Sequence, residues 1–418
     1  GATPQALGTV QFFDAQGDRL GSVQAGALPD MLTFTKDGSY LLVANEGEPS
    51  DDGLVDPEGS VTVVDMRAGL DDLVVRQVDF HGVPLRGPVR VFTPGNDASR
   101  DLEPEYVSTS GETAYVGIQE ANAIGILDIP SGEFEVVRSL GFKDWGESPL
   151  DTSNGDDGGP LLRSWTNVFG MYQPDAIATY ELPFTKRVRC TKGPDKGTKR
   201  CLRTERKTFV ATANEGDVRD WSFFSEEAEV ADLTLDSAAF AASATDADQL
   251  GELKVTSTLG DRDGDGDYDR LYAFGGRSLS VLDASGAVVD DTGGQLEQLS
   301  QSLDAGNFNK SNSAGSSVDN RSDDKGPEPE ALDVGRVAGH QYAFVAADRS
   351  GGIYAYDLTA TKGEARYADA YLNTRESDLG PEGALFLPAA ESPTGGPLLL
   401  LTYEVTSTVA AYSVSVEP

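Results

Sequence analysis

The sequence predicts an all-β fold, a β-propeller of about seven blades, and a unit that recurs along the chain is the main reason. Each unit begins with a proline and an acidic residue, except the one at Asp269, where no proline precedes the acid. It continues with a short apolar strand, a turn, a second apolar strand, and a later strand that ends in aspartate or a similar residue. Gly, Asp and Asn separate these strands, and helical periodicity is scarce. A sandwich would not repeat the same start, so the pattern favours a propeller.

Six such units can be aligned, and they begin at Pro29, Pro104, Pro174, Asp269, Pro329 and Pro381. We expect residues 1–418 to form a single β-propeller domain. Residues 8–25 resemble the last two strands of another unit and are expected to form a partial blade. Residues 226–245 form the one stretch whose pattern is compatible with a helix.

The third unit is interrupted by a basic hairpin insert at residues 185–207, which holds ten of the 33 Lys and Arg residues. It also contains the chain's two cysteines, Cys190 and Cys201, on either side of a Lys-, Gly- and Pro-rich turn. A disulfide between them would close the hairpin and indicate a location outside the cytoplasm, and two free thiols are the alternative. The insert is either a contact for an anionic polymer or a neighbouring subunit, or a solvated hairpin.

The net charge of −36 excludes some partners. Such a field repels nucleic acid and anionic membranes and favours cations, although a solvated acidic surface would explain much of it equally well. No apolar run approaches the length of about 18 residues that a spanning helix needs. The first residues, "GATPQALGTVQFF", contain no signal peptide, as expected of a cleaved or trimmed start.

Two acidic positions recur in the units, one where the first strand starts and one where the second strand ends. Because these strands are antiparallel, both positions lie on one face of a propeller, at the mouth of its channel. The first-strand starts are Asp30, Glu103, Glu105, Asp175, Glu328, Glu330 and Glu382. The second-strand ends are Glu46, Glu48, Glu120, Glu215, Asp217, Asp348 and Glu404. The sequence "ANEG", which occurs at residues 44–47 and 213–216, is such an end.

So many carboxylates at one mouth favour bound cations, because like charges raise each other's pKa and a metal ion relieves the repulsion. Oxygen ligands suit Ca²⁺, Mg²⁺ or Mn²⁺, and the presence of only two histidines, His81 and His340, argues against zinc. The alternative for each single acid is a turn residue bonded to backbone amides. Arg100, Arg277 and Arg349 are candidates for binding an anion, or for ion pairs with the surrounding acids.

A separate calcium loop is predicted in "DRDGDGDYD", residues 261–269. Asp261, Asp263 and Asp265 occupy loop positions 1, 3 and 5, as in known calcium loops, while Asp267 could offer its carbonyl and Asp269 its carboxylate. The residue at position 12 is not Glu, so the loop is not an EF-hand, and we expect a structural role. A polar hairpin turn is the alternative.

Two long polar loops, residues 144–160 and 308–330, are long enough to be functional. The second leads directly into the acidic positions. We therefore expect Asp323, Asp324 and Lys325 to cover the mouth.

Several long motifs resemble the choice-of-anchor I family, and the resemblance covers nearly the whole chain. They are "LPDMLTF", "LVANEGEPSDD", "DLEPEYV", "GMYQPDAIA", "DGDGDYDRLYAFGGRS" and "RSDDKGPEPEAL". The resemblance implies a secreted or surface-anchored bacterial propeller, similar to mesenchyme-specific cell-surface glycoproteins and to proteins labelled alkaline phosphatase-like. It also implies a distant relation to metal-dependent propeller phosphatases and phytases, in which calcium, sometimes with iron, is held at the channel mouth. Members have propeller sequence upstream of "GTVQFF", which implies a truncated or processed chain, and the cysteine arm looks like an insertion.

Two functions stay open from the sequence. The first is a metal-dependent phosphoesterase with Ca²⁺ and additional Fe³⁺, Mg²⁺ or Mn²⁺, although no nucleophilic side chain stands out. The second is a non-catalytic surface module that binds calcium, mineral or an anionic envelope polymer. Both are expected to be secreted, periplasmic or at the cell surface, with no nucleic-acid partner.

Overall fold

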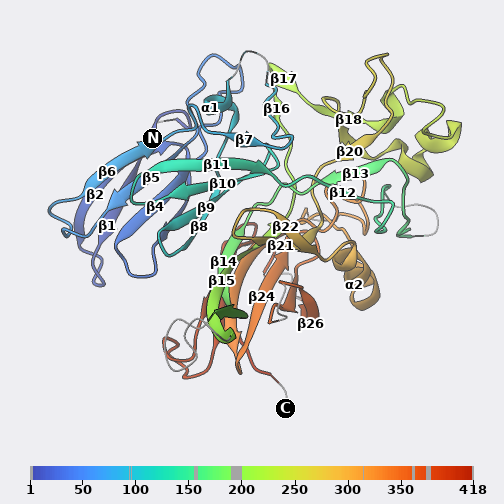
Figure 1. Cartoon of the computed structure of the whole chain (residues 1–418). Coiled ribbons are helices and arrows are strands. Elements are labelled where there is room, and N and C mark those ends of the chain that lie inside the picture. The colour runs from blue at the N-terminus through green and yellow to red at the C-terminus, as the bar shows by residue number, and fades with distance from the viewer. Residues whose placement is uncertain are drawn as a thin grey trace.

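The structure is a computed structural model that describes residues 3–93, 95, 97–154, 159–189, 200–313, 315–359, 363–372 and 378–416. Within these residues the protein is all-β with few helices, which confirms the all-β part of the predicted fold class. Figure 1 shows several sheets grouped around a central region, with the N-terminal and C-terminal sheets on different sides of it. None of the helices in this part of the chain has the length and apolar character needed to cross a membrane.

The N-terminal third contains two antiparallel meanders. The first consists of β3 (Pro29–Phe34), β4 (Tyr40–Asn45), β5 (Ser60–Asp65) and β6 (Val74–Val78). The second consists of β8 (Tyr106–Ser110), β9 (Thr113–Ile118), β10 (Ala123–Asp128) and β11 (Glu133–Ser139), with β7 (Leu85–Arg86) parallel to β11. The hairpin of β1 (Leu7–Phe13) and β2 (Arg19–Ala27) packs on the first meander, where Val10 and Phe12 contact a cluster that includes Leu41 and Val43.

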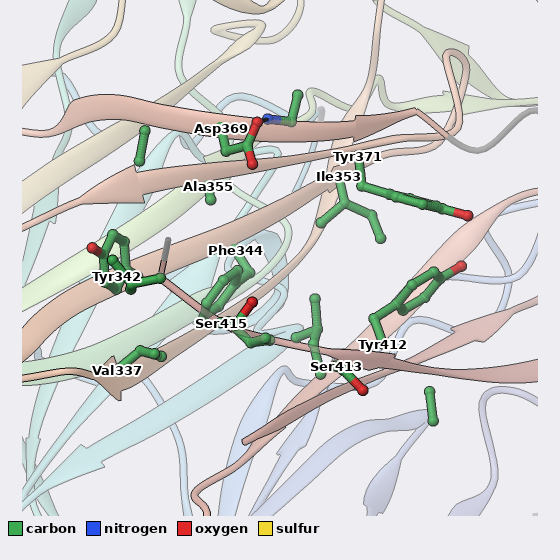
Figure 2. Close-up of a pocket in the computed structure, with 16 residues that line it drawn as sticks. Val337, Tyr342, Phe344, Ile353, Ala355, Asp369, Tyr371, Tyr412, Ser413 and Ser415 are labelled. Carbon is green, nitrogen blue, oxygen red and sulfur yellow. Dashed lines mark hydrogen bonds between the residues drawn. The ribbon is translucent and has the colours of Figure 1, made fainter. Parts of the chain in front are cut away.

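The C-terminal third has the same plan. One sheet consists of β23 (Pro329–Val337), β24 (His340–Ala347), β25 (Gly352–Asp357) and β26 (Arg366–Leu372). The next consists of β27 (Pro381–Leu387), β28 (Leu398–Tyr403) and β29 (Thr408–Ser413). A groove of about 830 Å³ lies between these two sheets, and Figure 2 shows Tyr371 and Tyr412 side by side along it, with ring centroids 5.1 Å apart.

The middle of the chain departs from the predicted order. The sheet of β14 (Ile177–Arg189) and β15 (Arg200–Asn214) is completed by β21 (Ser278–Asp283) and β22 (Val288–Asp291), far along the chain. The intervening residues form the hairpin β16 (Asp220–Trp221) and β17 (Phe224–Ser225) and contribute to a separate sheet. That sheet has the order β12 (Phe142–Asp144), β13 (Val168–Met171), β20 (Leu271–Ala273), β19 (Lys254–Thr256) and β18 (Glu227–Glu229). The prediction that one unit begins at Asp269 is therefore wrong, because the two strands that it would contain, β20 and β21, belong to different sheets.

The helix expected at residues 226–245 is also wrong. These residues form β18 and the short 3₁₀-helices η1 (Val230–Asp232) and η2 (Ala242–Thr245), followed by η3 (Ala247–Gly251). The side chain of Glu226 is buried and accepts hydrogen bonds from Arg90 and Thr256, and β18 pairs with β19. Tertiary contacts thus override the local helical pattern. The α-helices in the described residues are α1 (Ala98–Asp101) and α2 (Gln295–Leu303), and η4 (Ala305–Asn307) follows α2.

Successive sheets meet through their first strands, and this positions the candidate site. β3 contacts β8, β8 contacts β14, β14 contacts β23, and β23 contacts β27. Apolar clusters fill the spaces between neighbouring sheets: Val61 and Val116 belong to one, and Ala211 and Val345 to another. The starts of the first strands, which carry the predicted acidic positions, therefore point toward one central region.

Candidate metal centre

The repeated "ANEG" motif ends the second strand of two sheets, as predicted, and its asparagine has a structural role that sequence reasoning missed. Asn45 ends β4 and its Nδ2 donates to Ser60 and Thr62 of β5, with Nδ2–Oγ1 2.9 Å to Thr62. Asn214 ends β15 in the same way and donates from Nδ2 to Ser278 and Ser280 of β21 at 3.1 and 2.7 Å. Both asparagines are buried, so these hydrogen bonds fix the end of the second strand to the third.

The glycine of the motif permits the turn that follows. Gly47 has φ +76° and Gly216 has φ +103°, a region that residues with a side chain rarely adopt. A Cβ on Gly216 would lie 2.4 Å from the backbone nitrogen of Gly275. Because the asparagine and the glycine fix the backbone on both sides, the glutamate between them, Glu46 or Glu215, is held at the strand end.

The structure brings six of the predicted acids into two groups of three. Glu46, Glu105 and Glu120 offer carboxylate oxygens that all lie within 4.8 Å of one another. Asp175, Glu215 and Glu330 form a second group with the same property. Each group contains both kinds of position, as the antiparallel pairing predicts: the first has one first-strand start and two second-strand ends, and the second has two first-strand starts and one second-strand end. We call them the Glu105 cluster and the Glu215 cluster.

The remaining predicted acids lie around these clusters. Glu48 accepts a hydrogen bond from Trp221 Nε1 at 3.0 Å, and Asp348 accepts one from Asn312 Nδ2 at 2.7 Å. Glu328 is buried and pairs with Arg321 and Arg349. Glu382 and Glu404 are exposed at the ends of β27 and β28, so neither is enclosed by the protein.

Burial raises the pKa of the clustered carboxyls, and neighbouring acids raise it further. The pKa of Glu46 is raised to about 9 by desolvation and then by the charges of Glu120 and Glu48. The pKa values of Glu105 and Asp175 are well above their usual range for the same two reasons. Asp30 at the edge of this region has its pKa raised to about 6 by desolvation and by Glu382. At neutral pH the clusters therefore hold protons that a bound cation would displace.

The loop that ends at Glu330 reaches this region, as expected, and contributes a cation. Lys325 Nζ lies 3.0 Å from Glu215 Oε1, and 3.9 Å from both Asp217 Oδ1 and Glu328 Oε2. These carboxylates raise the pKa of Lys325 despite its burial. Asp324 instead turns toward Arg321 at 2.9 Å. The Glu215 cluster is thus partly neutralised by the protein itself.

The three arginines proposed to bind an anion lie in different surroundings. Arg277 is fully buried, and its guanidinium donates to Glu297 Oε1, Asp151 O, Ser322 O and Asp324 O at 2.8 to 2.9 Å. Arg349 pairs with Glu328 and Asp348 at 2.9 and 2.8 Å. Both arginines therefore form ion pairs with acids of the protein, which is the alternative to anion binding that the sequence left open. Arg100 is exposed on α1.

Two polar residues beside the clusters were not found from the sequence. Arg219 is fully buried, donates to Asp101 O at 2.7 Å and lies 3.7 Å from Glu103 Oε2. Gln119 donates to Glu215 Oε2 at 3.0 Å. Gln119 directly precedes Glu120 at the end of β9, so its position next to a predicted acid could have identified it from the sequence. Arg219 lies in the long excursion between β15 and β21 and gave no such signal.

The predicted calcium loop connects β19 and β20 in the separate sheet. Asp261, Asp263 and Asp265 offer oxygens within 4.8 Å of one another, and all three residues are exposed. Asp261 Oδ1 accepts from Gly264 N at 2.7 Å, and Asp269 Oδ2 accepts from Arg262 N at 2.7 Å. The charge of Asp265 raises the pKa of Asp263. The pKa of Asp267 is raised by desolvation and then by Asp265, with which its side chain interacts, and the expected role of its carbonyl stays a prediction.

The basic insert forms a long antiparallel hairpin of β14 and β15, paired from Ile177 opposite Thr212 to Arg189 opposite Arg200. Cys201 lies on β15 opposite Val188. Cys190 lies outside the described residues, so the disulfide stays a prediction.

Comparison with known proteins decides the family. The model of the choice-of-anchor I domain matches residues 1–186 and 193–361. The chain belongs to the choice-of-anchor I family. The break in this match, residues 187–192, falls within the basic insert of this choice-of-anchor I chain.

A curated relative supports the resemblance to animal surface proteins. Gigasin-3a of Magallana gigas is 32% identical over 188 residues, which covers 40% of this chain and 64% of that protein. The choice-of-anchor I chain thus spans less than two thirds of the length of this relative.

Several solved structures align over almost the whole chain at low similarity. The periplasmic gluconolactonase of Pseudomonas aeruginosa aligns with 97% of this chain and 92% of its own, at 13% identity and TM-score 0.33. A β-propeller domain from Myceliophteria thermophila aligns with 98% of this chain and 90% of its own, at 10% identity and TM-score 0.34. A protein of unknown function from Desulfotomaculum acetoxidans gives a TM-score of 0.36 at 10% identity and covers 99% and 91%. The sheets themselves, rather than these superpositions, define the architecture described above.

Proposed function

We propose that this choice-of-anchor I chain is an extracytoplasmic, surface-associated β-propeller of about seven blades that binds divalent cations at its acidic mouth. The contacts between successive first strands support the propeller, since inner strands of neighbouring blades meet in this way. Membership of the family supports the location, and a disulfide between Cys190 and Cys201 would agree with it.

Unpartnered oxygens in the Glu105 cluster carry the proposal. Glu105 and Glu120 are 8% and 6% exposed, and among the described residues neither Glu105 Oε2 nor Glu120 Oε2 accepts a hydrogen bond from an amide, hydroxyl or cationic group, which leaves the two carboxyls to share a proton with each other. Leaving a buried carboxylate oxygen without a partner is unfavourable by about 1–3 kcal/mol or more. Both residues group with Glu46 at distances that a single ion can bridge. A cation held by the three carboxylates would satisfy these oxygens and remove the like-charge repulsion.

The chemistry of the donors favours hard cations. Both clusters offer carboxylate oxygens alone, which suits Ca²⁺ and, with smaller coordination spheres, Mg²⁺ or Mn²⁺. Fe³⁺ is a further candidate at the Glu215 cluster. We expect the Glu105 cluster to bind more tightly, because Lys325 forms an ion pair with Glu215 itself. The cation beside the Glu105 cluster, Arg219, instead lies closest to Glu103 and Asp101.

We propose hydrolysis of a phosphoester as the activity of this site. A divalent cation held there would supply Lewis-acid activation of a phosphoryl oxygen and of water. Lys325 and Arg349 place positive charge beside the Glu215 cluster, where they would orient the anionic oxygens of such a substrate. The buried acids would accept and hold protons as the pH allows, because their pKa values are raised.

The test is an assay of a phosphomonoester and a phosphodiester with Ca²⁺, Mg²⁺, Mn²⁺ or Fe³⁺ supplied. Glu120→Gln and Glu215→Gln each keep the size of the side chain but remove a ligand charge. We expect each to reduce the rate roughly a hundredfold or more while the melting curve stays near that of the wild type. Glu391→Gln, on the exposed turn at the other end of the β27–β28 hairpin, is the matched control. Absence of hydrolysis by the wild type with all four ions contradicts the catalytic proposal.

A second candidate is a non-catalytic module that binds calcium, mineral or an anionic envelope polymer through bridging cations. The engagement of Lys325 and Arg349 by internal carboxylates favours it, since both cations already have partners. It predicts that cations bind to the clusters and that no ester is hydrolysed.

A further inference from the structure

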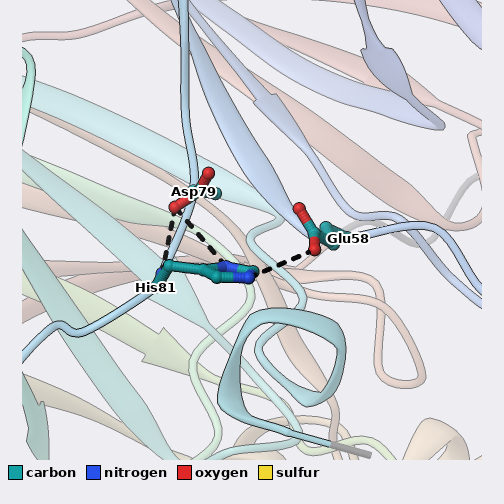
Figure 3. Close-up of side chains that lie close together, drawn as sticks. All are labelled: Glu58, Asp79 and His81. Atoms are coloured by element: carbon teal, nitrogen blue, oxygen red, sulfur yellow. Dashed lines mark hydrogen bonds and ion pairs between the residues drawn. The ribbon is translucent and has the colours of Figure 1, made fainter.

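A mixed-donor cluster on the first meander lies apart from the sites described above. Glu58, Asp79 and His81 are all exposed and offer ligand atoms within 4.8 Å of one another. His81 Nε2 lies 3.5 Å from Glu58 Oε1, and His81 Nδ1 lies 3.7 Å from Asp79 Oδ1. Figure 3 shows the imidazole between the two carboxylates.

The fold explains why these residues meet. β5 and β6 are antiparallel neighbours, with Val61 paired to Val78, so the residues just before β5 and just after β6 are adjacent. Phe80 is buried and stacks on Phe134 with ring centroids 4.5 Å apart. Its neighbours Asp79 and His81, by contrast, are exposed.

The backbone on both sides of the cluster is held in place. Gly59 N donates to Ser99 O at 3.0 Å, and a Cβ on Gly59 would lie 2.0 Å from Leu102 O. On the other side, His81 N donates to Asp79 Oδ1 at 3.0 Å. The three side chains are therefore presented from anchored segments.

We propose that Glu58, Asp79 and His81 form a surface site for a divalent transition-metal ion of the Zn²⁺ type, distinct from the oxygen-only calcium sites. In a tetrahedral zinc site with ligand distances of about 2.0–2.2 Å, a nitrogen and an oxygen ligand lie about 3.4 Å apart. The observed Nε2–Oε1 separation of 3.5 Å agrees with this span. Imidazole nitrogen selects such ions over calcium, which prefers oxygen ligands.

At this site Asp79 orients the imidazole and is not a ligand of the ion. A carboxylate at the far nitrogen of a metal-binding imidazole fixes the tautomer and increases the basicity of the ligand nitrogen. Asp79 lies on the Nδ1 side, which leaves Nε2 directed at Glu58. The sequence had argued against zinc because it has only two histidines. His81 Nε2 and a carboxylate oxygen of Glu58 are nonetheless two protein ligands that solvent can complete to a tetrahedral set, with Asp79 orienting the imidazole from its Nδ1 side.

The same scarcity of histidine makes the test direct. In the 418-residue chain, labelled at histidine Cε1 and saturated with Ca²⁺, NMR should show two imidazole resonances, from His81 and His340. His340 is the matched control, since it is 52% exposed and its Nδ1 lies 2.7 Å from a single carboxylate, that of Asp357. We expect ZnCl₂ to shift or broaden the His81 resonance at concentrations at least roughly tenfold lower than those that affect His340.

Variants complete the test. Glu58→Gln with Asp79→Asn should weaken the Zn²⁺ response of His81 roughly tenfold or more without changing the melting curve, because both side chains are exposed. His340→Ala should leave the response of His81 unchanged. Equal responses of the two histidines to Zn²⁺, or an unchanged response in the double variant, would show a simple imidazole–carboxylate ion pair and overturn the proposal. None of these residues belongs to the Glu105 or Glu215 cluster, so this outcome would not affect the proposed function.

Discussion

Replacing Glu46 by Gln should change how the stability of the metal-free protein depends on pH. The pKa of Glu46 is raised from 4.5 to about 9, first by desolvation and then by Glu120, Glu48 and other acids. Between these two values the folded protein holds a proton that the unfolded chain lacks. The free energy of unfolding must therefore fall as the pH rises through this window.

The size of the effect follows from the shift. One proton difference changes the free energy of unfolding by about 1.4 kcal/mol per pH unit, or about 3 kcal/mol between pH 5.5 and 8. Glu46 is only partly buried, and allowing for solvent screening reduces this to about 1.5 kcal/mol. Glu46→Gln carries a neutral side chain at every pH. Between pH 5.5 and 8, the free energy of unfolding of Glu46→Gln should therefore fall by about 1.5 kcal/mol less than that of the wild type.

Urea unfolding in the presence of a chelator at pH 5.5, 6.5, 7.5 and 8 measures both slopes. Glu391→Gln should retain the slope of the wild type, because the residue is exposed outside the acidic region. Saturating Ca²⁺ should remove the difference, since the ion replaces the proton. Equal slopes for the wild type and Glu46→Gln in chelator would refute the burial and repulsion assigned to this carboxyl.

Three further outcomes are expected. Asp263→Ala combined with Asp265→Ala should lower the melting temperature in Ca²⁺ and abolish the effect of a chelator on it. If the wild type melts at the same temperature with and without chelator, the loop holds no stabilising site. Arg277→Met should destabilise the protein by about 3–5 kcal/mol, because it leaves the buried carboxylate of Glu297 without its cationic partner. Adding Glu297→Leu should recover part of this loss in a urea titration, since the backbone carbonyls that accept from Arg277 stay without it. Thiol titration of the unfolded, unreduced protein should detect no free cysteine until a reductant is added, and two reactive thiols without reductant would contradict the Cys190–Cys201 disulfide.

Local patterns in the sequence predicted the acidic region because its geometry follows from strand pairing. Once β4 and β15 are second strands, the glutamates after Asn45 and Asn214 must lie at the same end as the acids that start the first strands. The sequence could not show which acids would form triads, since that depends on contacts between sheets. The sequence also could not show that the chain leaves this sheet after β15 and returns to it only at β21. β20 and β21 are separated by a few residues, and nothing local indicates that they join different sheets.

The roles of buried charges were the least predictable. Arg277 lies beside a second-strand end, so its position suggested the mouth, yet its guanidinium binds the carbonyls of the loop before Glu328 and the carboxylate of Glu297. That arrangement depends on α2 and on the loop that covers β21, which are distant in sequence. The sequence argument against zinc rested on the number of histidines. That number says nothing about the carboxylates that the fold places around His81.

Anomalous diffraction from crystals soaked in Mn²⁺ would test the central claim most directly, because it locates bound ions without requiring activity. The proposed function predicts an anomalous peak among Glu46, Glu105 and Glu120, with carboxylate oxygens at about 2.0–2.6 Å, and a weaker one among Asp175, Glu215 and Glu330 beside Lys325. Ions at the 261–269 loop alone, with neither cluster occupied, would contradict the claim that the acidic mouth is a metal centre.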